Sequence, residues 1–108
     1  MKTFLILTSL FISTICFSQI KVIQFNANWN SANGVNWLDQ LTDCKVGQVD
    51  IATNTAAQSK HKIIVVPTII VFNQGEEVKR YQANIMMQME AKLEDIQHIV
   101  DETIMESF

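Results

Sequence analysis

Two apolar patterns of different period run along the first half of the chain. Residues 20–25 alternate loosely between apolar and polar side chains and are β-branched, which is typical of a strand, and residues 45–51 predict a second strand. Between them, residues 31–42 predict a helix, because apolar side chains recur there at helical spacing at Val35, Trp37, Leu38 and Leu41. Asn30 or Ser31 is its expected N-cap. Thr53-Asn54-Thr55 then predicts the start of a short helix that ends at about Lys60.

The second half contains the most apolar run outside the N-terminal segment, residues 63–72, which only Pro67 and Thr68 interrupt. Proline has no N–H to donate within a sheet, so we expect a strand to begin directly after it, at residues 68–73. Residues 73–76 predict a turn with Gly75 at positive φ, and residues 77–82 predict a returning strand. The last apolar residues mark one face of a C-terminal helix: Met89, Leu93, Ile96, Val100 and Ile104.

The predicted order is therefore β-α-β-α-β-β-α. A right-handed β-α-β crossover followed by a hairpin gives a four-stranded mixed sheet with helices on both faces, which is an α/β fold.

Residues 1–18 have the pattern of a secretory signal peptide: one early positive charge, an apolar stretch, and small residues at Cys16 and Ser18. The apolar stretch is short for a hydrocarbon core of about 30 Å, which favours cleavage over an uncleaved anchor. We expect cleavage after Ser18, a mature domain over residues 20–106, and export to a periplasm or to the extracellular space. No membrane association is expected after cleavage.

Composition narrows the possible partners. Without Lys2, the chain has seven basic and eleven acidic side chains and no basic run that could neutralise a phosphate backbone, so nucleic acid is not an expected partner. Cys44 is the one cysteine after the signal segment, which excludes an intramolecular disulfide. The sequence does not indicate an oligomeric state.

Two ordered stretches resemble thioredoxins. The more specific one runs from Val49-Asp50-Ile51 through Val66-Pro67-Thr68 to the apolar run and glycine turn at residues 69–76. The other is the strand and loop of residues 22–33, in which thioredoxins carry a tryptophan directly before Cys-x-x-Cys. Trp29 matches that tryptophan, but Asn30 and Asn33 occupy the two cysteine positions. The resemblance covers residues 20–106 and implies a minimal thioredoxin-like fold whose Pro67 is cis.

A second substitution points the same way as the loss of both cysteines. Thioredoxins bury a carboxylate in the strand before the loop, and the matching residue here is Gln24. Dithiol exchange needs a thiolate and a resolving thiol, and an asparagine amide is neither nucleophilic nor redox-active. The sequence therefore predicts a domain without dithiol redox activity, either a binding module or a site that has simply decayed.

The resemblance also implies where a partner would bind. In thioredoxin-like proteins, the loop after the tryptophan and the residue before the cis-proline form a shallow groove for extended peptide. The corresponding residues are Asn28, Trp29, Asn30, Asn33, Val66 and Pro67. We therefore expect a protein or peptide partner at this groove.

The competing hypothesis is a thiol oxidoreductase that uses Cys44 or a cysteine of a partner. Cys44 is expected near the end of the first helix, as a small apolar filler between helix and sheet. A structural role as a self-associating subunit is the third possibility. No cofactor and no metal are expected, because His61 and His98 have no ligands at suitable spacing. Met86, Met87 and Met89 could form a soft copper site, but we expect them to pack between the last strand and the last helix.

Overall fold

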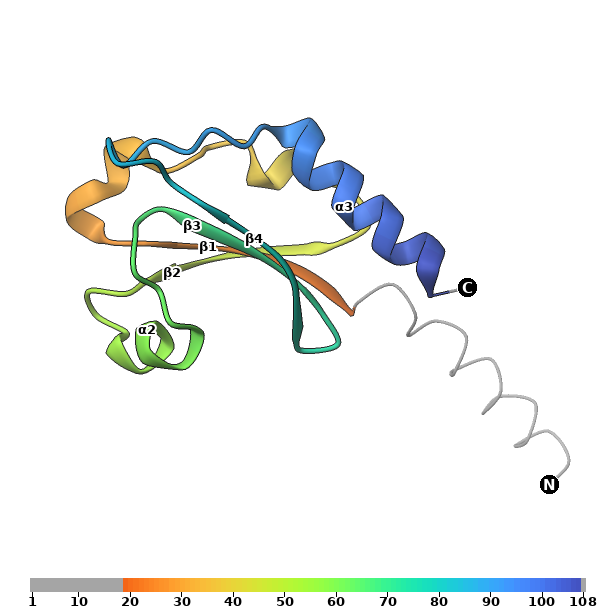
Figure 1. Ribbon diagram of the computed structural model, residues 1–108, viewed down its shortest axis with the longest axis horizontal. Coiled ribbons are helices and arrows are strands. Elements are labelled where there is room, and N and C mark those ends of the chain that lie inside the picture. Colours follow the sequence, from red (N-terminus) through yellow and green to blue (C-terminus); the bar gives the residue numbers. More distant parts are fainter. Residues whose placement is uncertain (1–18, 108) are drawn as a thin grey trace, which may run out of the picture.

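A four-stranded mixed sheet forms the centre of the computed structural model, which describes residues 19–107 (Figure 1). The strands are β1 (Ile20–Asn26), β2 (Lys45–Asp50), β3 (Thr68–Asn73) and β4 (Glu76–Gln82), in the spatial order β2-β1-β3-β4. β1 runs parallel to β2 and antiparallel to β3, and β4 is antiparallel to β3. The predicted mixed sheet is thereby confirmed. The predicted signal peptide lies outside the described residues.

The two faces of the sheet have separate cores, because side chains alternate across each strand. Ile20 and Val22 of β1 face one core, with Ile69 and Val71 of β3, beneath helix α3 (Leu93–Glu106). Phe25 of β1 faces the other core, on the side of helix α2 (Thr55–His61). Helices therefore cover both faces, as the sequence predicted (Figure 1). Met89 precedes α3 but still packs against the first core.

Helix α2 is anchored at both ends by side chains. Its N-cap is Asn54, whose side chain accepts a hydrogen bond from the Ala57 N–H, as predicted. At the other end, the Arg80 guanidinium of β4 donates to the carbonyls of His61 at 2.6 Å and Lys62 at 3.1 Å. Arg80 thus supplies donors to the carbonyls that the end of a helix leaves unsatisfied.

The predicted helix over residues 31–42 is wrong. The connection from β1 to β2 contains two short 3-10 segments, η1 (Asn28–Asn33) and η2 (Leu38–Gln40), and the predicted caps are not used. The apolar positions were nevertheless identified correctly, since Leu38 and Leu41 are buried in the first core. The physical reason is local: asparagine side chains compete for backbone hydrogen bonds, and this segment also contains Gly34 in an extended conformation.

The β3–β4 turn matches its prediction. Gln74 has φ 55° and Gly75 has φ 85°, so both central residues are left-handed, as a two-residue type I′ hairpin requires. In residues 19–107, no helix is long and apolar enough to cross a membrane.

Candidate functional site

Three loops meet at one end of the sheet because of its strand directions. Phe25 pairs with Thr68, and Thr68 pairs with Gln82, so the end of β1, the start of β3 and the end of β4 lie at the same end of the sheet. The segments that follow β1, precede β3 and follow β4 are residues 27–36, 63–67 and 83–89, and Figure 1 shows all three at this end of the sheet. The residues predicted to form the groove lie on the first two.

Asn30 and Asn33, at the positions of the missing cysteines, are hydrogen-bonded to each other. The Asn33 Nδ2 donates to the Asn30 Oδ1 at 2.8 Å. The Asn30 Nδ2 donates to the Asn26 Oδ1 at 3.1 Å and to the Val66 carbonyl at 3.4 Å, and the Asn26 Nδ2 donates to the Asn30 carbonyl. Asn30 is only 5% exposed. Its amide therefore stabilises the loop from inside, and of the two asparagines only Asn33 is exposed.

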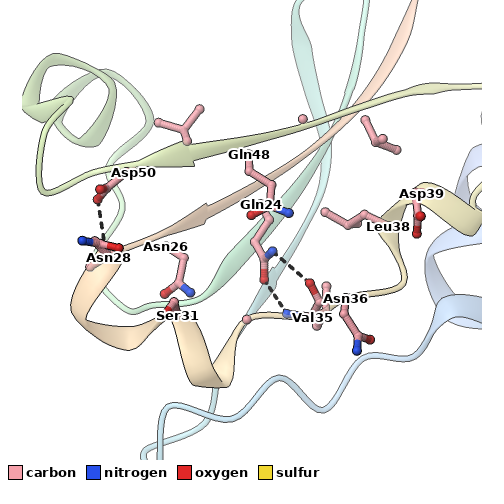
Figure 2. A pocket seen from close by; sticks show the side chains of 15 residues that line it. Gln24, Asn26, Asn28, Ser31, Val35, Asn36, Leu38, Asp39, Gln48 and Asp50 are labelled. Atoms are coloured by element: carbon pink, nitrogen blue, oxygen red, sulfur yellow. Dashed lines mark hydrogen bonds between the residues drawn. The ribbon is translucent and has the colours of Figure 1, made fainter.

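Gln24 has a comparable internal role. It is 1% exposed, and its amide forms two hydrogen bonds with one residue: Oε1 accepts from the Val35 N–H at 2.8 Å, and Nε2 donates to the Val35 carbonyl at 3.3 Å (Figure 2). An ionised carboxylate could accept the first bond but could not donate the second. The glutamine thus fixes the backbone at Val35, where the expected helix is absent.

Trp29 lies at the surface at this end of the sheet. Its side chain is 68% exposed, and Asn28 beside it is also exposed. The Asn28 N–H donates to the Asp50 carboxylate at 3.2 Å, which joins the loop to the end of β2 (Figure 2). Val66 and Pro67 are buried, and the peptide bond between them is cis. The structure therefore brings the predicted residues together, with Trp29, Asn28 and Asn33 at the surface and Asn30, Val66 and Pro67 below it.

A cleft lies next to this loop, over β1 and β2. Its volume is about 800 Å³, and its polar lining includes Gln24, Asn26, Gln48 and the carboxylates of Asp39 and Asp50 (Figure 2). Among the described residues, no α-helix connects β1 to β2, and Val46 of β2, which lines the cleft, is 41% exposed. The sequence did not reveal this cleft, because it follows from the missing helix.

Cys44 lies away from the loops described above. It directly precedes β2, whose first residue pairs with Lys21 near the start of β1, so it lies at the opposite end of the sheet from Trp29. The length of β2 puts about 20 Å between the two ends. Burial raises the pKa of the Cys44 thiol above its usual value, and the carboxylates of Asp43 and Asp101 raise it further. Cys44 packs against the first core, but from a loop and not from the end of a helix as predicted.

The connection after β4 presents a feature that sequence reasoning missed. Ile85 is 99% exposed, Met86 68% and Met87 40%, so the prediction that the methionines pack between strand and helix is wrong for Met86 and Met87. Asn84 holds the segment in shape: its Oδ1 accepts from the N–H groups of Met86 and Gln88, and its Nδ2 donates to Glu90. The signal in the sequence was an asparagine before an apolar run, which favours a local turn.

Within residues 19–107, no group of three or more His, Cys, Asp or Glu side chains is placed to hold a metal ion. His61 instead packs between the rings of Phe25 and Phe72, at centroid distances of 5.1 and 5.2 Å. Its pKa is lowered by burial and by the neighbouring charges of Lys60 and Arg80.

The fold resembles those of solved thioredoxins. A mutant thioredoxin from Halobacterium salinarum is 22% identical, with a TM-score of 0.61 over 79% of this chain and 74% of that one. Thioredoxin from Schistosoma mansoni is 20% identical, with a TM-score of 0.61 over 89% and 85% of the two chains. Oxidised thioredoxin from Plasmodium falciparum is 18% identical, with a TM-score of 0.56 over 89% and 91%. No protein-family model and no curated protein matches the sequence. The chain has a thioredoxin-like fold.

Proposed function

We propose that this thioredoxin-fold chain is an exported, non-redox module that binds a protein or peptide segment beside Trp29 and Pro67. The observation that carries the proposal is the hydrogen bond between Asn33 and Asn30, which occupies the place of the dithiol. The loop is held together by this hydrogen bond, and it presents the exposed Trp29 with no thiol beside it for disulfide exchange. Tryptophan is among the side chains most often found at binding hot spots.

Site-specific photocrosslinking tests the proposal. A photoreactive residue at Asn28, which is exposed, is compared with one at Glu76, which is exposed at the opposite end of the sheet. We expect Asn28 to capture a defined protein from the periplasmic or secreted fraction, and we expect Trp29→Ala to abolish that capture. Recovery of the same proteins from both positions would refute a specific groove.

Thiol chemistry at Cys44 is the second candidate function. The raised pKa of the Cys44 thiol and its distance from Trp29 both argue against it, because only the thiolate attacks a disulfide. In an insulin-reduction assay with dithiothreitol, we expect the rate of the reductant alone. A faster rate that Cys44→Ser removes would favour an oxidoreductase instead.

A further inference from the structure

The two edges of the sheet differ in how well they are protected against pairing with a further strand. Among the described residues, β2 and β4 are the edge strands, because the spatial order is β2-β1-β3-β4. Four of the seven residues of β4 are charged, and its pairing with β3 contains a register shift between Val71 and Phe72. Charged side chains and bulges are common means by which proteins prevent pairing at an edge. The β4 edge is therefore protected.

The β2 edge has neither of these protections. Its sequence is Lys-Val-Gly-Gln-Val-Asp, so charges stand only at its first and last residues, Lys45 and Asp50. Its six residues pair with β1 in continuous register, from Lys45 opposite Lys21 to Asp50 opposite Asn26. A regular edge strand with an uncharged centre is a template for another strand.

One hydrogen bond identifies the backbone groups of β2 that point away from β1. In a strand, the N–H and C=O of one residue point to the same side, and those of the next residue point to the other side. The Ile51 N–H, directly after β2, donates to the Asn26 carbonyl of β1 at 2.9 Å. The backbone groups of Val46 and Gln48, an odd number of residues away, therefore point outward, and no turn or loop hydrogen bond among residues 19–107 uses them.

The exposed strand is complementary to itself. Antiparallel pairing of two copies places Lys45 of one strand at the end where Asp50 of the other lies, whereas parallel pairing would put like charges side by side. A register centred on Gln48 brings the outward groups of both copies together, and its side-chain amide can donate to and accept from its own copy. Each Val49 then lies opposite Gly47, where an added Cβ would meet nothing within 4 Å.

We propose that β2 pairs antiparallel with β2 of a second copy of this chain, about a two-fold axis at Gln48, and so joins two four-stranded sheets into one. Such a contact is closed, because it uses the same free edge of both copies and leaves the protected β4 at each outer edge. The dimer goes beyond the proposed function, since binding beside Trp29 needs no second copy. One short strand from each copy buries less than the roughly 1,600 Å² of a standard interface, so we expect a dissociation constant of about 100 µM.

Sedimentation velocity from about 5 µM to about 1 mM tests the dimer on the protein obtained by expressing the full chain. We expect a shift from monomer to dimer as the concentration rises. Gln48→Lys and Gln48→Glu should each weaken association about tenfold or more, because like charges then meet at the axis. An equimolar mixture of the two variants should associate again, which also shows that both are folded. Val78→Lys on β4, where Val78 is 44% exposed, is the matched control and should leave association unchanged.

Crosslinking tests the direction and register of the pairing. In a Cys44→Ser background, Gln48→Cys places one thiol of each copy beside the axis, and a short bismaleimide should join them. Antiparallel pairing separates the two copies of residue 45 by about 20 Å, so Lys45→Cys should not be joined by the same reagent.

The outcomes separate the dimer from its alternatives. Association that both Gln48 variants lose and their mixture regains supports the inference. A monomer up to about 1 mM would leave the β2 edge free for a strand of another protein and overturn the inference, whatever photocrosslinking at Asn28 shows for the proposed function. Association that Val78→Lys abolishes, or that neither Gln48 variant weakens, would place the contact elsewhere and also overturn it. Efficient crosslinking of Lys45→Cys would refute the antiparallel two-fold.

Discussion

At the scale of single residues, amides hold the loop in place by donating and accepting at the same time. Gln24 bonds both backbone groups of Val35, and Asn30 bonds Asn26, Asn33 and Val66. An ionised carboxylate at these positions could not donate, and a thiol donates and accepts only weakly. The substitutions therefore form one consistent set that stabilises a loop without an α-helix behind it.

Gln24→Glu should make stability depend on pH. A buried glutamate at this position loses the donor to the Val35 carbonyl when ionised, so its folded pKa is raised above the unfolded value of about 4.3. A carboxyl group whose pKa is raised in the folded state does not lower the free energy of unfolding below its unfolded pKa. As the pH rises from the unfolded pKa toward the folded pKa, the free energy of unfolding falls. We expect a loss of about 2 kcal/mol at neutral pH and little loss at about pH 4, measured by urea unfolding.

Gln48→Glu is the matched control for this change, since Gln48 pairs with Gln24 across β1 and β2 but is exposed. It should change the free energy of unfolding by less than about 0.5 kcal/mol at either pH. Equal, pH-independent losses in the two variants would show that the Gln24 amide does not anchor Val35.

At the scale of elements, the strands and the last two helices were predictable, and the first crossover was not. β3 begins directly after Pro67 as predicted, because a missing N–H is a strictly local constraint. The spacing of Val35, Leu38 and Leu41 shows that one side of this segment is buried. It does not distinguish an α-helix from a connection with two short 3-10 segments, which can bury the same side chains. The exposure of residues 85–87 was missed because apolar residues were assumed to be buried, whereas these residues lie in a turn that Asn84 holds by accepting from the N–H groups of Met86 and Gln88.

The anchoring of α2 by Arg80 predicts a measurable loss. Arg80→Met removes the donors to the carbonyls of His61 and Lys62 and also the ion pair with Glu77 at 2.9 Å. We expect the free energy of unfolding to fall by about 1–2 kcal/mol, with faster amide exchange over α2.

Lys79→Met serves as the control, because the Lys79 ammonium lies 6.0 Å from the Tyr81 ring centroid and the ion pair of Arg80 does not involve it. Its loss should stay below about 0.5 kcal/mol. If both variants are equally stable, the guanidinium does not support the helix end.

Restoring the two cysteines should not restore a reactive thiol. A low thiol pKa arises at a helix N-terminus, beside a cation or within a Cys-x-x-Cys pair. The variant supplies the pair, but residues 27–36 contain no Lys, Arg or His and η1 is a 3-10 segment, so the two stronger causes are missing. In an Asn30→Cys/Asn33→Cys variant that also carries Cys44→Ser, we expect the more reactive thiol to keep a pKa of about 8.5 or higher. The pH dependence of alkylation by iodoacetamide measures this value.

A single Asn28→Cys in the same Cys44→Ser background gives the reference for an exposed thiol on this loop. The double variant should react no faster than this reference at neutral pH. An alkylation midpoint below about pH 7 would mean that the loop still activates a thiol and that only the cysteines have been lost.

At the scale of the whole molecule, the described fold is compatible with cleavage of the predicted signal peptide after Ser18. Gln19 is the first described residue, and it already belongs to the domain: its carbonyl accepts from the Gln74 N–H at 3.0 Å and its Oε1 from the Gln74 Nε2 at 2.6 Å. Ile20, the first residue of β1, is 5% exposed in the core. Cleavage after Ser18 leaves these contacts intact, and cleavage two or more residues later would remove part of β1.

Expression of the full chain in a Gram-negative host, followed by fractionation and intact-mass measurement, tests the export hypothesis. We expect the periplasmic or secreted protein to begin at Gln19 and to carry one free thiol, Cys44, with no intramolecular disulfide. Ile6→Arg interrupts the apolar stretch of the signal and should keep the uncleaved chain in the cytoplasm. A full-length mass in the membrane fraction would instead identify residues 1–18 as an anchor, joined to the domain at the end of the sheet opposite Trp29.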